Sequence, residues 1–362
     1  MTTAPEKSGA VLLPPHLQGL PQVSGLPRME NVSDATLQDG FGRTLGDLRL
    51  SVTDRCNFRC LYCRPSEDPG LPRQQILSFD EIERLARIFV DLGIRKIRVT
   101  GGEPLVRRDL PLLLSRLARL KDRGLEELVL TSNGSLLAPL ALALREAGVD
   151  RLNLSCDSLS AEGFRHLAGR DGLALFMHGL EAAQEAGFRG TKVNCVVIRG
   201  VNDHEVVDFA RFARQRDLAV RFIEFMPLDE GAEWGPERVV PAAEILARLQ
   251  EAFELTAIPP RNPAETASRF SLAGAGEIGV ISSVTAPFCA RCNRVRLTAD
   301  GHLRTCLFAL QETDLRGLIR SGAEDQDLVQ AIRRAVRTRE RAHHINEPGY
   351  IRPGRNMAGI GG

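Results

Sequence analysis

Short apolar runs alternate with amphipathic stretches from about residue 46 to residue 228. The apolar runs have the length and the β-branched content of buried strands. We predict six strands, at Leu48–Thr53, Lys96–Thr100, Glu127–Thr131, Arg151–Ser155, Lys192–Ile198 and Ala219–Met226. Between them, apolar residues at three- and four-residue spacing predict amphipathic helices, among them Phe79–Leu92, Leu110–Lys121 and His204–Arg216.

Repeated strand–helix units predict an α/β fold with a parallel sheet covered by helices. Six units are too few for the usual closed barrel of eight strands, so we expect a partial (βα)6 TIM-like barrel; a doubly wound sheet is the alternative. Either fold places the site at the carboxyl ends of the strands. Motifs that follow the second, third and fourth predicted strands are Gly101-Gly102-Glu103-Pro104, Ser132-Asn133-Gly134 and Asp157-Ser158.

The pattern changes on both sides of the barrel region. Residues 1–45 are rich in Pro and Gly and lack a sustained period, which predicts a mobile N-terminal extension. Residues 46–230 form the predicted barrel. Residues 231–362 form a smaller C-terminal region, with helices expected at Ala242–Phe253 and around Asp325–Arg341 and a flexible tail from Arg355.

Composition narrows the function classes. The 362 residues carry a formal net charge of +1, so nothing in the overall charge favours nucleic acid or a membrane surface as a partner. No apolar run approaches the roughly 18 residues of a membrane-spanning helix, and the start lacks a secretory signal, so we expect a cytoplasmic protein. Cys156 and Cys195 lie in apolar strands and are expected to be buried core thiols.

The other six cysteines form two tight groups, which is typical of metal ligands in a reducing compartment. Cys56, Cys60 and Cys63 follow the first strand with the spacing C-x3-C-x2-C. Three thiolates on a cluster of four irons leave one iron open to a small chelating molecule. A zinc site is the alternative, although structural zinc takes four ligands and no fourth His or Cys lies nearby in the sequence.

This first group resembles the signature of the radical S-adenosylmethionine superfamily, carried here by Cys-Asn-Phe-Arg-Cys-Leu-Tyr-Cys at 56–63. The resemblance implies a partial (βα)6 barrel and a [4Fe-4S] cluster whose open iron chelates S-adenosylmethionine. Gly101-Gly102-Glu103-Pro104 is similar to the superfamily's glycine-rich motif, which holds the methionine amino group. Glycine allows the close backbone approach that such a contact needs.

Cys289, Cys292 and Cys306 form a second triad with the spacing C-x2-C-x13-C. The spacing leaves two readings open: a second open cluster, or a Cys3His zinc site completed by His302. Arg294 and Arg296 follow Cys292 after a single intervening residue, and an alternating arginine pair can hold a polyphosphate through charge-assisted hydrogen bonds. Alternatively, these two arginines simply lie on the solvent-exposed face of a strand.

Two triads around a (βα)6 barrel, the arginine pair and a terminal Gly-Gly together resemble the GTP 3',8-cyclase family of molybdenum cofactor biosynthesis. The resemblance implies two [4Fe-4S] clusters, at Cys56, Cys60 and Cys63 and at Cys289, Cys292 and Cys306. It implies S-adenosylmethionine contacts at Tyr62, Gly102, Ser155 and Met226. It implies GTP contacts at Arg49, Arg98, Thr131, Lys192, Arg294, Val295 and Arg296, and a catalytic role for Gly361 and Gly362.

The same resemblance implies the reaction. A 5'-deoxyadenosyl radical removes the ribose 3' hydrogen of GTP, and the carbon radical attacks guanine C8 to give 3',8-cyclo-7,8-dihydro-GTP. An external one-electron donor, a downstream pterin synthase and a homodimer are also implied. Two other functions stay open: a peptide-modifying radical enzyme with an auxiliary cluster, and a redox-silent zinc-binding interaction protein.

Overall fold

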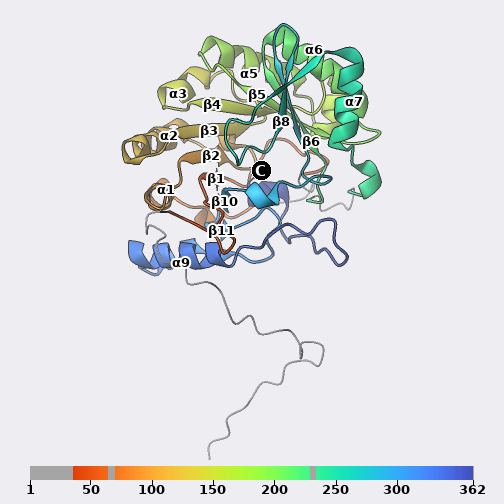
Figure 1. Cartoon of the computed structure of the whole chain (residues 1–362). Coiled ribbons are helices and arrows are strands. Elements are labelled where there is room, and N and C mark those ends of the chain that lie inside the picture. The colour runs from red at the N-terminus through yellow and green to blue at the C-terminus, as the bar shows by residue number, and fades with distance from the viewer. Residues whose placement is uncertain (1–35, 64–69, 229–233, 362) are drawn as a thin grey trace, which may run out of the picture. The chain divides into compact units, whose positions relative to one another are not determined.

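The computed structural model describes residues 36–63, 70–228 and 234–361, which belong to one compact unit. In these residues a 12-stranded sheet has the order β12-β11-β10-β1-β2-β3-β4-β5-β6-β9-β8-β7. Figure 1 shows β1 to β5 in succession, with β10 and β11 following on the side of β1. No helix in the described part of the chain is both long and apolar enough to cross a membrane.

The six predicted strands are present, each within two residues of its predicted bounds. They are β1 (Asp47–Ser51), β2 (Lys96–Thr100), β3 (Glu127–Ser132), β4 (Arg151–Ser155), β5 (Lys192–Val197) and β6 (Ala219–Glu224). Each pairs in parallel with the next. The α/β fold with a partial barrel of six parallel strands is therefore confirmed, and the doubly wound alternative is excluded by the strand order.

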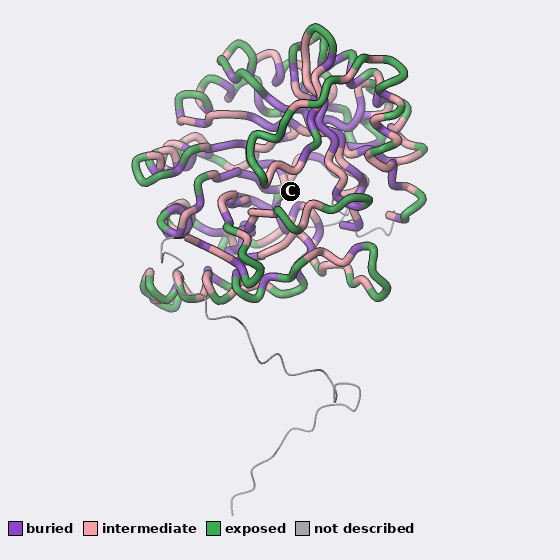
Figure 2. The backbone as a smooth tube through the Cα atoms, viewed as in Figure 1, coloured by how far each residue is buried: buried purple, intermediate pink, exposed green. Residues whose placement is uncertain are grey.

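Seven helices of the described chain accompany these strands: α1 (Phe79–Asp91), α2 (Leu110–Ala118), α3 (Ala141–Glu146), α4 (Ala161–Ala168), α5 (Leu173–Glu185), α6 (Val206–Arg216) and α7 (Ala242–Ala252). In α1, a capping box between Ser78 and Glu81 fixes the start, and Ile82, Leu85 and Phe89 pack into the core. Figure 2 shows that the buried positions are concentrated in the strands, whereas the exposed positions lie on the outer turns of the helices.

The C-terminal region extends both edges of the barrel sheet. β10 (Arg294–Leu297) pairs in parallel with β1, and β9 (Glu277–Ile281) pairs in parallel with β6. The remaining elements are β7 (Leu255–Ile258), β8 (Ser268–Leu272), β11 (His302–Arg304), β12 (Thr313–Asp314), α8 (Leu315–Arg320), α9 (Asp325–Arg337) and α10 (Met357–Ile360). The predicted boundary between residues 230 and 231 lies outside the described residues.

Two predictions about the ends of the chain need correction. Leu37 and Leu45 are buried in the main core, and Gln38 bridges Thr44, so the predicted mobile extension reaches ten residues too far. The tail is also ordered, because Asn356 caps α10 and Ile360 is buried. The predicted mobility of residues 1–35 lies outside the described residues.

The barrel strands are apolar on the outside and polar on the inside. Leu48 and Leu50 of β1 pack in the core, whereas Arg49 between them lines the interior, and β2 repeats the pattern with Ile97, Arg98 and Val99. Closed eight-stranded barrels normally fill this space with branched apolar side chains. Here the interior is left open for a polar ligand.

Candidate active site

The inner face of the barrel encloses a cavity of about 1090 Å³. Residues from all six parallel barrel strands line it, including Arg49, Arg98, Thr131, Ser155, Lys192 and Arg221. Both cysteine triads line the same cavity. The structure thus brings most of the predicted site residues together around one space.

The first triad occupies the loop that leaves β1. Cys56, Cys60 and Cys63 are partly exposed and face the cavity, and the amide of Cys63 donates to the carbonyl oxygen of Cys60 at 3.0 Å. Burial, with Cys63, Asp157 and Cys56 adding negative charge, raises the pKa of the Cys60 thiol well above its usual range. Because thiolates are the ligating form, a positively charged metal centre would relieve this mutual repulsion.

Gly101 and Gly102 pack directly against the loop that carries this triad. The Gly102 amide donates to the Thr53 carbonyl oxygen at 2.8 Å. A Cβ on Gly101 would lie 2.5 Å from that same oxygen, and one on Gly102 would lie 2.5 Å from the Arg55 carbonyl oxygen. The glycines are therefore required by backbone packing in the protein itself, in addition to any contact with a ligand.

Tyr62 is held by a buried carboxylate. Its hydroxyl donates to Asp157 Oδ2 at 2.6 Å, while the Val196 amide donates to Asp157 Oδ1 at 2.8 Å. Burial raises the pKa of Asp157 to about 6, although both hydrogen bonds act in the opposite direction. The ring of Tyr62 is thus tied to the ends of β4 and β5. Ser155 and Met226 line the same cavity, and Met226 also packs against a small apolar cluster.

The second triad lies at the other end of the barrel. Cys289 and Cys292 precede β10, whose first residue Arg294 is paired with Asp47, the first residue of β1. Cys292 therefore lies at the amino end of the strands, whereas Cys56 lies beyond the carboxyl end. A five-residue strand such as β1 spans about 16 Å. The expectation that the whole site lies at the carboxyl ends is wrong, because the cavity runs through the barrel.

Among the thiols of the second triad, Cys292 has a pKa that is lowered by nearby arginines. Burial opposes ionisation, but Arg294 and Arg339 lower the pKa of this thiol to about 6. Arg294 also lies over the Phe288 ring, 4.8 Å from its centroid. A thiolate is therefore the stable form at neutral pH, as a metal ligand requires.

The zinc alternative with His302 does not fit the geometry. Arg304, the last residue of β11, is paired with Arg296, whereas His302 begins β11 and does not line the cavity that all three cysteines line. His302 Nδ1 instead lies 3.1 Å from Asp300 Oδ2. Within the described ranges, no three His, Cys, Asp or Glu side chains are grouped to hold a single metal ion.

The predicted GTP-contacting basic residues line the cavity between the triads. Burial, together with Arg296, Arg294 and Arg98, lowers the pKa of Arg49 well below its ordinary value. The Nε atoms of Arg49 and Arg98 are buried without a hydrogen-bond partner among the described residues. Arg98 Nη1 donates to Thr131 Oγ1 at 3.3 Å. Such crowded, under-neutralised guanidinium groups favour an anionic ligand.

Lys192 shows the same shortage of negative charge. Burial, with Arg221, Arg151 and Arg261 nearby, lowers its pKa to about 6 against the opposing effect of Glu277. In the protein alone this amine is mostly neutral at pH 7. An anion in the cavity would favour its protonated form.

Three predicted residues are placed differently from the rest. Val295 is fully buried in the core, because its side chain points to the opposite face of β10 from Arg294 and Arg296, so any substrate contact would come from its backbone. Gly361 lies against the inner strands, and its carbonyl oxygen accepts a hydrogen bond from Arg296. Gly362 lies outside the described residues.

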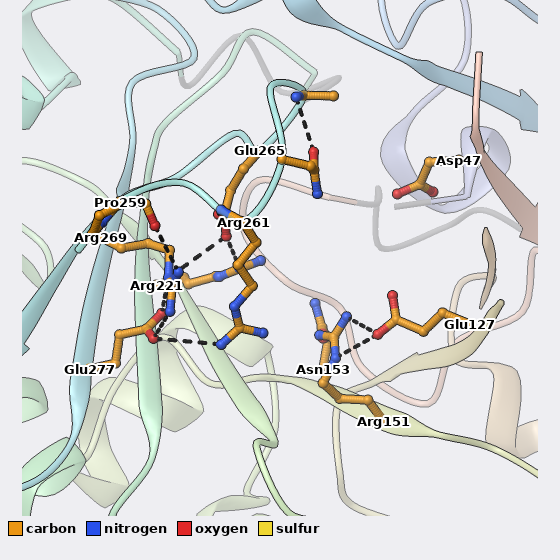
Figure 3. A network of polar contacts seen from close by, with 12 residues as sticks. Asp47, Glu127, Arg151, Asn153, Arg221, Pro259, Arg261, Glu265, Arg269 and Glu277 are labelled. Carbon is orange, nitrogen blue, oxygen red and sulfur yellow. Dashed lines mark hydrogen bonds and ion pairs between the residues drawn. The ribbon is translucent and has the colours of Figure 1, made fainter. Parts of the chain in front are cut away.

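Several further charged residues line the cavity and were not predicted: Lys96, Glu127, Arg151, Arg221, Arg261 and Glu265. Figure 3 shows Arg221 and Arg261 on one side, and Arg151 with Glu127 on the other. Arg151 is 2.6 Å from Glu127, and Arg221 is 3.6 Å from Glu265. Their signal was present in the sequence, since Lys96, Arg151 and Arg221 occupy the same alternating strand positions as the predicted residues.

Comparison with known proteins agrees with this architecture. The Radical SAM superfamily model matches residues 50–213, and the Molybdenum Cofactor Synthesis C model matches residues 218–345. In fold, the chain is similar to the crystal structure of Streptococcus suis SuiB, with a TM-score of 0.53 and 14% identity over 77% of this chain and 66% of that one.

The sequence relatives are much closer. The chain is 47% identical to the GTP 3',8-cyclase of Rhodopirellula baltica, over 92% of this chain and 94% of that protein. It is 45% identical to the mitochondrial GTP 3',8-cyclase of Arabidopsis thaliana, over 86% of this chain and 80% of the relative. It is 43% identical to the enzyme of the same name from Moorella thermoacetica, which it covers completely. With this identity along nearly its whole length, the chain belongs to the GTP 3',8-cyclase family of radical S-adenosylmethionine enzymes.

Proposed function

We propose that this chain cyclises GTP to 3',8-cyclo-7,8-dihydro-GTP, the first step of molybdenum cofactor biosynthesis. The observation that carries the proposal is a single cavity with a cysteine triad at each end and unneutralised guanidinium groups between them. A triphosphate fits the charge of this space, and the length of the barrel leaves room for a substrate between two redox centres.

Cys56, Cys60 and Cys63 would hold a [4Fe-4S] cluster, and their three partly exposed thiols on one loop suit that donor set. With S-adenosylmethionine, the bound cluster supplies a 5'-deoxyadenosyl radical that can remove the 3' hydrogen of GTP. Tyr62, Gly102, Ser155 and Met226 would contact S-adenosylmethionine, with Tyr62 oriented by Asp157. The protein's contribution is to place the reacting atoms and to exclude water.

Cys289, Cys292 and Cys306 would hold a second [4Fe-4S] cluster at the amino end of the barrel. Three thiols would again leave one iron of such a cluster without a protein ligand. Arg294 and Arg296 of β10 would supply positive charge next to this triad. The phosphates would meet Arg49, Arg98, Thr131, Lys192, Arg294 and Arg296, with the backbone of Val295 between the last two.

Gly361 and Gly362 would assist catalysis at the end of the chain. Gly361 is held beside the cavity by Arg296, at a place where a Cβ would collide with Ser51 and Thr100 on the inner strands. Without a side chain at this position the backbone can approach a ligand closely. The proposal also includes an external one-electron donor, a homodimer, transfer of the product to a pterin synthase and a cytoplasmic location.

The decisive test is S-adenosylmethionine cleavage by anaerobically reconstituted, reduced protein, with and without GTP, followed by mass spectrometry of the nucleotide. GTP should stimulate formation of 5'-deoxyadenosine and yield the cyclised dihydro product. Cleavage that leaves GTP intact would keep the radical chemistry and reject GTP as the substrate. A zinc-binding interaction protein would be colourless and would not cleave S-adenosylmethionine.

The peptide-modifying alternative has little support. The similarity to SuiB, one of whose crystal structures contains a precursor peptide, is 14% in sequence and therefore concerns the fold alone. A peptide substrate would also leave the guanidinium groups of Arg49 and Arg98 without an obvious anionic partner.

A further inference from the structure

The segment that precedes β1 forms a tight turn around one carboxylate. The Asp39 amide donates to the Arg43 carbonyl oxygen at 3.1 Å, and Gln38 bridges Thr44. Asp39 Oδ1 accepts from the amides of Phe41 and Arg43, each at 3.0 Å. Backbone amides of the turn therefore hold the Asp39 carboxylate in place, independently of its contacts with other side chains.

This carboxylate joins two arginines that are far apart in the sequence. Asp39 Oδ2 lies 2.6 Å from Arg43 Nε and 3.5 Å from Arg339 Nη1. The three side chains are 0%, 9% and 3% exposed, respectively. We call Asp39, Arg43 and Arg339 the Asp39 clamp. Its formal charge is +1, and breaking one pair would leave a buried charge without a partner.

Both arginines of the clamp also reach the backbone of the second triad. Arg43 Nη1 donates to the Cys289 carbonyl oxygen at 2.7 Å, and Arg339 Nη1 donates to the Cys292 carbonyl oxygen at 2.9 Å. Arg43 also donates to the carbonyl oxygens of Glu340 and Arg341, at 2.7 and 2.8 Å. Two cysteines of one triad are thus fixed through the same carboxylate.

We propose that the Asp39 clamp is the positioning unit of the second metal centre: it fixes the Cys289–Cys292 loop and places one positive charge behind it. The inference rests on the proposed second [4Fe-4S] cluster. The guanidinium fork matters at Arg43, whose Nε meets the carboxylate while Nη1 and Nη2 meet carbonyl oxygens, which a lysine cannot do with the same geometry. Arg339 contributes its charge and one donor, Nη1, to the Cys292 carbonyl oxygen. Partners behind metal ligands set both metal affinity and redox potential.

The test uses the full chain with Cys56, Cys60 and Cys63 changed to Ala, so that bound iron reports the second triad alone. In this parent, Arg43→Lys keeps the charge but removes the fork, and Arg339→Lys keeps the charge but displaces the donor to the Cys292 carbonyl oxygen. Iron release to a chelator should become about 10–100-fold faster. The matched control is Arg84→Lys, because Arg84 also joins a carboxylate, Asp325, and a carbonyl oxygen, that of Ala323, but lies outside the cavity lining.

Asp39→Asn gives a second readout that loss of packing would not produce. It raises the formal charge of the clamp from +1 to +2, so the cluster's midpoint potential should rise, since positive charge favours the reduced form. The two lysine variants should leave the potential close to that of the parent. Faster iron release together with this potential pattern supports the clamp.

Other outcomes separate the two proposals. If the parent binds iron but all three variants release it at the parental rate with an unchanged potential, the clamp is wrong and the second cluster stands. If the parent binds no iron, the second cluster fails and the clamp fails with it. In a chain with both triads intact, equal iron loss from both triads would indicate a folding defect and overturn the assignment.

Discussion

Arg296 donates a hydrogen bond from Nη1 to the carbonyl oxygen of Gly361, with a distance of 2.7 Å. Arg296 is on the inner face of β10 and Gly361 follows α10, so this bond joins the end of the chain to the cavity wall. Gly361 has φ +86°, and a Cβ there would lie 2.7 Å from Ser51 Cβ. The position therefore demands glycine for both conformation and space.

Gly361→Ala should impair cyclisation while both triads keep their iron. The left-handed backbone and the contact with Ser51 together cost about 1–3 kcal/mol, which the tail can relieve only by leaving the wall. We expect turnover of GTP to fall about tenfold or more. Gly359→Ala is the matched control, because its Cβ would meet nothing closer than 3.4 Å and its φ is not positive. Parental turnover by Gly361→Ala would refute the role of the tail contact.

Arg49→Met should change stability and binding in opposite directions. Removing a buried guanidinium that is crowded by Arg296, Arg294 and Arg98 should stabilise the protein without ligand by about 1 kcal/mol. GTP affinity should fall about 10–100-fold, because a charge-assisted hydrogen bond is lost. Thermal unfolding and titration calorimetry measure the two effects. S-adenosylmethionine affinity should not change.

The control for this substitution is Arg108→Met, at a side chain that is 94% exposed. It removes the same charge from the chain without touching the cavity. If Arg49→Met destabilised the protein without ligand, Arg49 would have a stabilising partner within the protein. The inference that its buried charge is neutralised only by a bound anion would then be wrong.

The barrel was predictable because its strands have a simple sequence signature. In Lys96–Thr100, Ile97 and Val99 supply the apolar outer face, and the polar residues alternate with them. The same alternation contained the signal for Lys96, Arg151 and Arg221 as cavity residues. Family resemblance singled out other positions, and the regular strand pattern would have found these three.

The position of the second triad was not predictable from the sequence. It depends on the parallel pairing of β10 with β1, two strands separated by most of the chain, and no local pattern encodes that pairing. The ordered tail was missed for a similar reason. Residues such as Ala358 and Gly359 have little periodicity, and their order comes from tertiary contacts such as the one between Arg296 and Gly361.

GTP binding should take up a proton at Lys192. Its pKa in the protein alone is about 6, because of burial and the nearby Arg221, Arg151 and Arg261. Phosphate groups stabilise the protonated amine and raise this pKa in the complex. The bound state then holds more protons than the free state, so affinity should fall as the pH rises above about 6. Calorimetry in buffers of different ionisation enthalpy measures the proton uptake.

Lys192→Arg separates this effect from the titration of GTP itself. Arginine stays protonated at about pH 6 to pH 8, where Lys192 is expected to titrate. The variant should therefore take up fewer protons than the parent when GTP binds. The difference between the two proteins isolates Lys192. Equal proton uptake would show that Lys192 is already charged before GTP binds.

Asp157→Asn should stabilise the protein without ligand at high pH and progressively less at low pH. Burial raises the folded-state pKa of Asp157 from 3.8 to about 6, so the folded state binds the proton more tightly than the unfolded state. Stability from this group is therefore greatest below pH 3.8 and is lost as the pH rises to about 6, after which the loss is constant. An asparagine stays neutral throughout and avoids that loss.

The amide can also keep both contacts of Asp157, because its oxygen can accept from the Val196 amide and its nitrogen can donate to the Tyr62 hydroxyl. S-adenosylmethionine affinity should therefore stay at the parental value. Urea unfolding at pH 4 and pH 8, about two units on either side of the Asp157 pKa, measures the stability difference. Asp171→Asn, at a side chain that is 81% exposed, is the control. If the stability gain from Asp157→Asn were the same at both pH values, the carboxylate would be ionised or protonated throughout, and its burial would not set its pKa.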